Sequence, residues 1–262
     1  MGRIQVMEFE DLDWFPSLWR KGLTDTLYFY NRFFNLYGAI VPKLREVLEK
    51  LECRSLVDLG SGSAGPMPMI VEQLQKRENY EVEAILTDKY PDLEGLEKAG
   101  AGSKGRINFR KEPIDAANVP PDLNGFRTMF TSFHHFDPVM AGKILQDAAK
   151  KNAGIGIFEI NSRKVVPFVS MMAAPLFVLI FTLLVRPWSL ARLFWTYIIP
   201  AVPLAALWDA IASNLRYYSP PELQSLVEGI SEDGYVWEIG TVPSLLWFRV
   251  TYLFGYPLPD GD

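Results

Sequence analysis

The sequence predicts an α/β fold in which a mostly parallel central sheet is flanked by helices. Between residues 55 and 160, short apolar runs alternate with segments of helical periodicity, the order that crossover helices between parallel strands produce. The apolar runs are nearly continuous, as expected of strands that are covered on both faces. A glycine-rich turn follows the first run at residues 60–65, and such a turn lets a ligand approach the backbone closely.

The elements are expected in the following order. Residues 10–51 should form helices rich in aromatic side chains, and the last of them is amphipathic. Strands are predicted at 55–60, 81–88, 107–113, 126–133 and 154–160, with helices at 66–77 and 138–151. A glycine-rich stretch at 95–105 has no assigned element. A capped helix is expected within 216–230, and two final strands within 235–257.

Composition limits the classes of function. Hydrophobic residues make up 49% of the chain and charged residues 22%, which is too many charges for a bundle of membrane spans. The net charge of −5 disfavours nucleic acid as a partner. Cys53 is the single cysteine, so no disulfide framework is expected and a reducing compartment, the cytoplasm, is the default. The acidic start of the chain predicts no signal peptide.

The glycine turn raises the question of its ligand. Gly60, Gly62 and Gly65 make the pattern G-x-G-x-x-G, which is typical of dinucleotide-binding loops. Asp58, two residues before the first glycine, would repel a pyrophosphate if its side chain points at the ligand, whereas it suits an ammonium or sulfonium. Asp88 ends the next apolar strand, where it can accept hydrogen bonds from two ribose hydroxyls. An acidic residue has the same role at the ribose of a nicotinamide dinucleotide, so Asp88 does not distinguish between the two kinds of cofactor.

Four phrases in register carry a family resemblance. "VDLGSGSAGP", "ILTDKYPD", "EPIDAANVP" and "TMFTSFHHFDP" resemble the class I S-adenosylmethionine-dependent methyltransferases over roughly residues 55–160. The resemblance implies a Rossmann-like fold and S-adenosyl-L-methionine as the cofactor. It places Gly60 and Gly62 under the methionine part, Asp58 near the amino group, Asp88 at the ribose, and Asp115 with Ala116 at the adenine. The full set of cofactor-binding residues it implies is Asp58, Gly60, Ser61, Gly62, Asp88, Lys89, Asp115, Ala116 and Ser132.

Two further sets of residues are candidates for the acceptor side. His134 and His135 follow a predicted strand, where either could act as a general base or orient the acceptor; the alternative is a structural hydrogen bond beside a helix cap at Asp137. No metal is expected. Arg20, Thr24 and Tyr28 share one helical face, with Asp25 beside it. The resemblance implies a lid there, and the alternative is a solvated polar edge.

Two apolar stretches form an expected helical-hairpin insertion at about residues 165–210. Residues 167–185 and 193–208 contain no charge. A helix of 19 residues reaches about 28 Å, close to the roughly 30 Å hydrocarbon core. A spanning hairpin would carry Arg186 and Arg192 outside, against the positive-inside tendency. Three interpretations stay open: a hairpin resting on the inner face of a membrane, a soluble cap or homodimer contact through 167–208, and a double span.

The expected organisation is an N-terminal helical lid (1–51) followed by a methyltransferase domain (52–262) that contains the insertion. The predicted function is S-adenosylmethionine-dependent methyl transfer to a hydrophobic small molecule or a lipid-like acceptor, with the membrane surface as one setting for it. Two alternatives are kept: an NAD(P)-dependent oxidoreductase using the same glycine loop, and a non-catalytic, membrane-docked module that binds S-adenosylmethionine.

Overall fold

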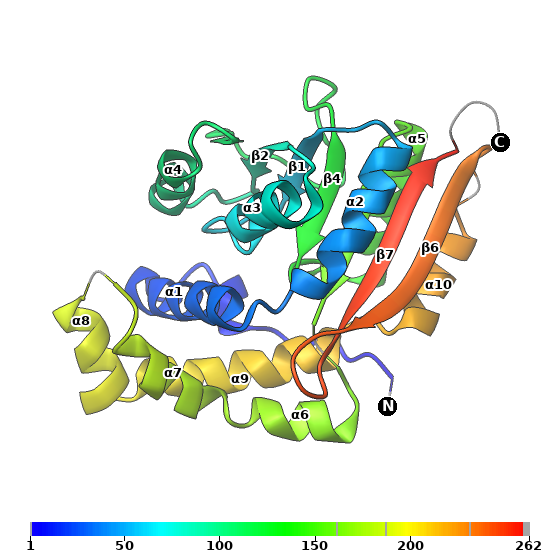
Figure 1. Cartoon of the computed structure of the whole chain (residues 1–262). Coiled ribbons are helices and arrows are strands. Elements are labelled where there is room, and N and C mark those ends of the chain that lie inside the picture. Colours follow the sequence, from blue (N-terminus) through cyan, green and yellow to red (C-terminus); the bar gives the residue numbers. More distant parts are fainter. Residues whose placement is uncertain (1, 161, 187, 231, 259–262) are drawn as a thin grey trace. The chain divides into compact units, whose positions relative to one another are not determined.

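The computed structural model describes residues 2–160, 162–186, 188–230 and 232–258. The chain divides into two compact units (Figure 1). Unit 1 is drawn from Met1–Leu36, Asn161–Tyr217 and Leu245–Phe248, and unit 2 from Tyr37–Ile160, Tyr218–Ser244 and Arg249–Asp262. The amphipathic stretch at 41–50, which the sequence grouped with the N-terminal helices, belongs to unit 2.

Unit 2 is built on a seven-stranded sheet in the order β3-β2-β1-β4-β5-β7-β6. Neighbours from β3 to β5 are parallel, whereas β7 runs antiparallel to both β5 and β6. The predicted mostly parallel α/β fold is confirmed. The strands are β1 (Ser55–Leu59), β2 (Glu83–Thr87), β3 (Ile107–Phe109), β4 (Phe126–Phe130), β5 (Ile155–Glu159), β6 (Tyr235–Pro243) and β7 (Arg249–Pro257).

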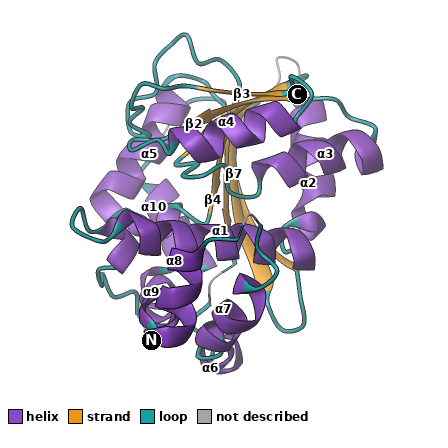
Figure 2. Cartoon of the chain, turned by 90° about the vertical axis from the view of Figure 1, so that its left-hand side faces the viewer, coloured by secondary structure: helices purple, strands orange, loops and turns teal. Residues whose placement is uncertain are grey.

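Helices cover both faces of this sheet. Figure 2 shows the sheet nearly edge-on, with α2 and α3 on one side and α5 and α10 on the other. The helices of unit 2 are α2 (Val41–Lys50), α3 (Met67–Glu78), α4 (Leu93–Gly102), α5 (Pro138–Lys150) and α10 (Pro220–Glu228), with short 3₁₀ turns at Gly38–Ile40 and Phe133–His135. Because helices cover both faces of the sheet, the strands carry apolar side chains on both faces.

The main core lies under α5 and α10. Val57 and Leu59 of β1 pack with Ile157 of β5 and with the apolar faces of the two helices. Both helices begin as the sequence predicts: the Asp137 carboxylate accepts a hydrogen bond from the Met140 amide at the start of α5, and α10 opens with a capping box from Ser219. These caps fix the helix starts against the sheet.

Helix α4 forms in the glycine-rich stretch that the sequence left without an element. Its glycines permit close approach: a Cβ at Gly95 would lie 2.7 Å from an Asp92 oxygen and 2.8 Å from the Ser63 Cβ. A Cβ at Gly100 would likewise lie 3.3 Å from the Ile107 carbonyl oxygen. A glycine in a helix interior lowers helix stability by about 1 kcal/mol relative to alanine, so the local sequence does not favour a helix here. The helix forms because Gly95 lets it pack closely against the loop after β1.

The helices of unit 1 come from two separate parts of the chain, and a third part, Leu245–Phe248, adds a turn. The helices are a 3₁₀ turn (Phe9–Asp11), α1 (Ser17–Phe34), α6 (Val165–Met171), α7 (Ala174–Thr182), α8 (Leu190–Leu193), a π-helical segment η4 (Phe194–Ile198) and α9 (Ala201–Arg216). The insertion has two arms packed together, as expected of a helical hairpin, but neither arm is one continuous helix. Each arm is broken, because Pro175 lies in the first turn of α7 and Pro200 precedes α9.

The insertion packs on α1, and Figure 1 shows α7 and α9 running side by side. Val178 and Val202 form a buried cluster with Leu23 of α1, and the Phe181 ring packs against those of Phe29, tilted, and Phe34, edge to face. No single helix of the described residues is long and apolar enough to cross a membrane. Two bent pairs pass that test together, α6 with α7 (43°) and Leu190–Ile198 with α9 (74°).

Candidate functional site

The predicted cofactor residues of unit 2 meet at the carboxyl edge of the sheet. Asp58 of β1 pairs in register with Leu86 of β2 and with Thr128 of β4. Because these strands are parallel, the loops that follow β1, β2 and β4 leave the sheet at the same edge. Ligands of open α/β sheets bind at this edge, and the sequence predicted the site there.

The loop after β1 has an unusual backbone. Gly60, Gly62, Ala64 and Gly65 all have positive φ angles, of 68°, 52°, 85° and 46°. A Cβ at Gly60 would lie 3.2 Å from the Ser132 Oγ, whereas one at Gly62 would meet nothing within 4 Å. Gly60 therefore serves the close approach of the loop after β4, and the Cα of Gly62 faces open space, which lets a ligand approach the backbone there.

Asp88 lies beside this loop, directly after β2. One carboxylate oxygen accepts a hydrogen bond from the Gly62 amide at 2.7 Å, and the other accepts one from the Tyr90 amide at 2.7 Å. A carboxylate has about four acceptor positions, so two are left for further donors. The two backbone amides hold the carboxylate in place, which prepares it to accept the paired hydroxyls of a ribose.

Asp58 lies beneath the loop and is almost fully buried. Its carboxylate accepts hydrogen bonds from the Ser61 and Thr128 hydroxyls, both at 2.7 Å. Burial raises the pKa of Asp58 to about 7, and the nearby Asp88 charge adds to the rise. The side chain thus ties β1, β4 and the glycine loop together. Its proximity to a cofactor amino group stays a prediction, and its position under the loop weakens the argument that it repels a pyrophosphate.

The buried Asp58 gives a testable pH dependence of stability. Between its unfolded pKa near 4 and about 7, the folded state binds one more proton than the unfolded state, so the free energy of unfolding falls as pH rises. Asp58→Asn keeps a hydrogen-bonding side chain and has no such proton. We expect urea unfolding to show the variant gaining roughly 1–4 kcal/mol relative to the wild type between pH 5 and pH 8. Parallel pH profiles of the two proteins would contradict the raised pKa.

The adenine-side candidates lie next along the same edge. The Ile114 amide donates to the Asp88 carbonyl at 2.9 Å, which brings the segment after β3 against the end of β2. The Asp115 carboxylate accepts a hydrogen bond from the Ala117 amide at 2.9 Å and lies 3.8 Å from the Lys89 ammonium. Ala116 is buried. Lys89 and Asp115 are both half-exposed, so this ion pair is weak and can open to a ligand.

The loop after β4 carries the remaining candidates. The Ser132 Oγ is buried beside Gly60 and makes no hydrogen bond within the described residues. His134 is buried, and its Nδ1 lies 2.8 Å from the Glu159 carboxylate, which also accepts a hydrogen bond from the His134 amide at 3.2 Å. The His135 ring lies against that of His134, with the centroids 4.4 Å apart.

The sequence missed three residues that shape this loop. Glu159 ends β5 and holds His134; a carboxylate closing an apolar strand was the signal available for it. Thr131 has a φ of 49°, a strained value for a β-branched residue. The hydroxyl of the fully buried Tyr37 hydrogen-bonds the Thr131 hydroxyl. No local pattern marks Tyr37, because its role depends on a contact across the fold.

The predicted lid residues belong to unit 1, where they make ties within that unit. The Arg20 guanidinium donates to the Leu12 carbonyl at 2.6 Å. Asp25 accepts a hydrogen bond from Arg192 at 2.9 Å, and the Thr24 hydroxyl bonds the Arg20 carbonyl of its own helix at 3.2 Å. Tyr28 is exposed. Their use as a lid stays a prediction.

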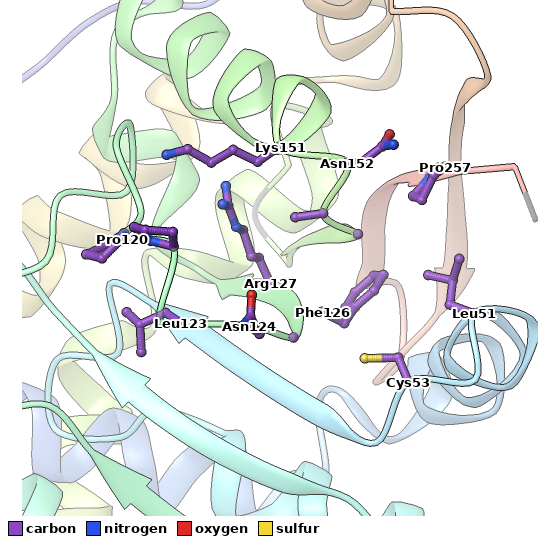
Figure 3. Close-up of a pocket in the computed structure, with 14 residues that line it drawn as sticks. Leu51, Cys53, Pro120, Leu123, Asn124, Phe126, Arg127, Lys151, Asn152 and Pro257 are labelled. Atoms are coloured by element: carbon purple, nitrogen blue, oxygen red, sulfur yellow. The ribbon is translucent and has the colours of Figure 1, made fainter.

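A hollow of about 440 Å³ lies at the opposite end of the sheet from the predicted site. Figure 3 shows Arg127 and Lys151 extending along it, with Cys53 and Leu51 at the other side. Asp147 pairs with both cations, at 2.8 Å from Arg127 and 2.5 Å from Lys151. None of the predicted site residues lines this hollow, so the chemistry is assigned to the carboxyl edge.

No protein-family model and no curated protein matches this sequence. Solved structures do match its fold. An O-methyltransferase from neocarzinostatin biosynthesis (NcsB1), solved with S-adenosyl-L-homocysteine and 1,4-dihydroxy-2-naphthoic acid, aligns with a TM-score of 0.55 at 15% identity, over 92% of this chain and 59% of that one. The S-adenosylmethionine-dependent methyltransferase SibL, in its apo form, aligns with a TM-score of 0.52 at 14% identity, over 88% of this chain and 58% of that one.

This chain therefore spans less than two thirds of the length of either structure. At these identities the likeness is one of fold. It agrees with the sheet order, the antiparallel β7 and the loop after β1 described above. The chain has the fold of the class I S-adenosylmethionine-dependent methyltransferases.

Proposed function

We propose that this chain transfers a methyl group from S-adenosyl-L-methionine to a hydrophobic small-molecule or lipid-like acceptor. The observation that carries the proposal is the sheet order, with antiparallel β7 inserted between β5 and β6, combined with the glycine loop and Asp88 at the carboxyl edge. Dinucleotide-binding sheets of the Rossmann type have the order 3-2-1-4-5-6 instead. The same glycine pattern therefore points to the smaller cofactor.

The residues of the carboxyl edge fit this cofactor. The Ser132 Oγ is buried without a hydrogen-bond partner among the described residues, so a polar ligand group beside Gly60 would satisfy it. Gly62 leaves open space where a Cβ would stand. Asp88, already oriented by two amides, has acceptor positions left for ribose hydroxyls. Asp115 and Lys89 would then border the adenine.

When bound, the cofactor supplies a methyl group on a sulfonium. His134 is the candidate base for an acceptor hydroxyl. Glu159 holds the imidazole at Nδ1 and favours the positive charge that forms when the ring takes up the acceptor proton at Nε2. Glu159 is thus a positioning residue, and its charge compensates the imidazolium in a buried site. The ring of His135 lies beside that of His134, tilted by 31°.

The aromatic and apolar character of unit 1 supports a hydrophobic acceptor. Its helices gather Phe29, Tyr30, Phe177 and Phe181 into one contiguous ring cluster. Such surfaces stack on flat or extended apolar ligands. The His134–Glu159 pair favours a hydroxyl oxygen of the acceptor as the methylated atom, because a hydroxyl loses a proton when it is methylated.

The proposal is tested by calorimetric titration with S-adenosylhomocysteine. We expect tight binding by the wild type and at least a hundredfold loss in Asp88→Ala, because two charge-assisted hydrogen bonds are removed. The matched control is Asp122→Ala, which removes an exposed carboxylate from the same unit. Both variants should keep the thermal unfolding midpoint within a few degrees.

Each other outcome points to one alternative. Binding of NADH but not of S-adenosylhomocysteine would overturn the proposal in favour of an oxidoreductase. Binding of S-adenosylhomocysteine without transfer of labelled methyl groups to any component of a lipid or small-molecule extract would favour a non-catalytic module.

A further inference from the structure

Unit 1 exposes apolar side chains to an extent that unit 2 does not. Among the described residues, more than half of the exposed large apolar side chains fall between 165 and 208. Unit 2 contributes only Tyr90, Leu93, Val139 and Leu258 to that set. Soluble monomers rarely leave a large contiguous apolar patch uncovered, so a surface of this kind indicates an interaction.

The exposed residues of α6 and α7 form one stripe. Their spacing of three or four places them on a single face along the bent pair, and each is 46–76% exposed: Val165, Val169, Met172, Leu176, Ile180 and Leu183. The opposite face of the pair is the one that packs inside unit 1, through Val178, Phe181 and Val185. The stripe is therefore an additional apolar face beyond the one that the fold needs.

A second group of exposed apolar residues lies in the segment after α7. It includes Trp188, Leu190, Phe194, Ile198 and Leu204. We call this group together with the α6–α7 stripe the apolar face of unit 1. Tryptophan at the border of an apolar surface is typical of the lipid headgroup region.

Charge in this part of the chain has one sign. Residues 162–208 contain four basic residues and no acidic residue, in a chain whose net charge is −5. Arg192 is buried and paired with Asp25. Lys164 is exposed at the start of α6, and the exposed Arg186 places its guanidinium 3.7 Å from the centroid of the Trp188 ring. Basic residues therefore border both ends of the stripe.

The helix geometry agrees with a surface location. Both apolar arms are bent, by 43° and by 74°. The buried Arg192–Asp25 pair ties the second arm to α1 inside the unit, which a helix surrounded by lipid would have to break. Short amphipathic helices with a broad apolar face and basic borders bind in the plane of a membrane interface.

We infer that the apolar face of unit 1 docks on an anionic lipid bilayer surface. A second copy of the chain fits it less well, because a twofold interface places the same patch against itself. Lys164 and Arg186 would then face a surface of the copy that has no acidic residue within 162–208. Anionic headgroups supply the missing negative charge.

The test is co-sedimentation of the purified chain with vesicles of phosphatidylcholine, alone or mixed with phosphatidylglycerol. We expect binding to the mixed vesicles that weakens with salt. The double variant Leu176→Ser with Ile180→Ser should bind at least tenfold more weakly, because two apolar side chains no longer enter the interface. The matched control, Val139→Ser with Leu258→Ser, changes exposed apolar residues of unit 2 and should bind as the wild type does.

A charge variant separates the electrostatic contribution to vesicle binding from the apolar one, and its binding to phosphatidylcholine shows that the variant is folded. Lys164→Glu with Arg186→Glu should lose affinity for the mixed vesicles and leave binding to phosphatidylcholine unchanged. Failure of the wild type to sediment, or equal binding by all variants, would overturn the inference. So would a dimer in analytical ultracentrifugation that the serine variant dissociates, which would assign the face to a second copy. No cofactor is present in these measurements, so their outcome is independent of the proposed methyl transfer.

Discussion

Replacing His134 by alanine is expected to lower kcat for a hydroxyl acceptor by roughly 10²- to 10⁴-fold, the usual contribution of a positioned general base. The imidazole lies on the turn after β4 and is held at Nδ1 by Glu159 at 2.8 Å. Affinity for S-adenosylhomocysteine should stay within a few fold of the wild type, because Asp88 and the glycine turn, which would hold most of it, lie on other loops and only Ser132 shares the loop of His134. Steady-state kinetics combined with calorimetry separates the two effects.

Two companion variants make this prediction specific. Glu159→Gln keeps an oxygen that can accept the Nδ1 proton but loses the charge, so its kcat should fall less than that of His134→Ala. His135→Ala should change kcat severalfold at most. An unchanged kcat in His134→Ala would show that methyl transfer proceeds through proximity and alignment alone, and would remove His134 from the catalytic role.

The second large effect concerns the stability of unit 1. Arg216 at the end of α9 is 1% exposed and is ion-paired with Asp11; its guanidinium also donates to the Val6 carbonyl at 3.1 Å and lies 3.5 Å from Glu8. Arg216→Met removes the positive charge that faces the acidic side chains of Glu8 and Asp11. Breaking a buried pair on one side costs about 3–5 kcal/mol, and we expect a loss of this size in urea unfolding. Arg77→Met, at an exposed position on α3, should be nearly neutral.

This loss should grow with pH. Burial and the neighbouring Asp209 raise the pKa of Glu10 to about 8, and burial raises that of Asp209 to about 7. Both groups bind protons more tightly in the folded state, so the stability they contribute is present at low pH and is lost as pH rises through 7 to 8. Glu8 and Asp11, the partners of Arg216, raise both pKa values by repelling the charged forms, and without Arg216 this repulsion is no longer offset. A defect of equal size at pH 6 and pH 8.5 would contradict this account.

Local sequence patterns were sufficient for the part of the fold that holds the site. The predicted strands overlap those of the structure, although the strands predicted at 107–113 and 126–133 end at Phe109 and Phe130. The carboxyl-edge position of Gly60, Asp88 and Ser132 follows from parallel pairing. Helix α4 could not be predicted in this way. Its formation depends on Gly95 packing against Ser63 of another loop, a contact that leaves no periodic signal.

The same limit applies to individual roles at the site. The two carboxylate oxygens of Asp58 each accept a hydrogen bond, from Ser61 and from Thr128, and its place near a cofactor amino group stays a prediction. The direction of a side chain at a strand end depends on the neighbouring strand, which local sequence does not specify. The two apolar stretches of the insertion are each long enough for one continuous helix. Each is broken near a proline, Pro175 or Pro200, so the positions of the prolines and not the length of the stretch determine where the helices end.

The three-part composition of unit 1 has a consequence for the order in which the chain folds during synthesis. Helix α1 is made early, whereas α7 and α9, which cover its aromatic rings, are made only after the five strands from β1 to β5. The aromatic face of α1 therefore stays uncovered until α9 has been made, and α10, β6 and β7 of unit 2 follow only after that. Apolar surface that is exposed for this long during synthesis makes a chain prone to aggregation, so deleting α9 should raise the share of newly made chain that aggregates.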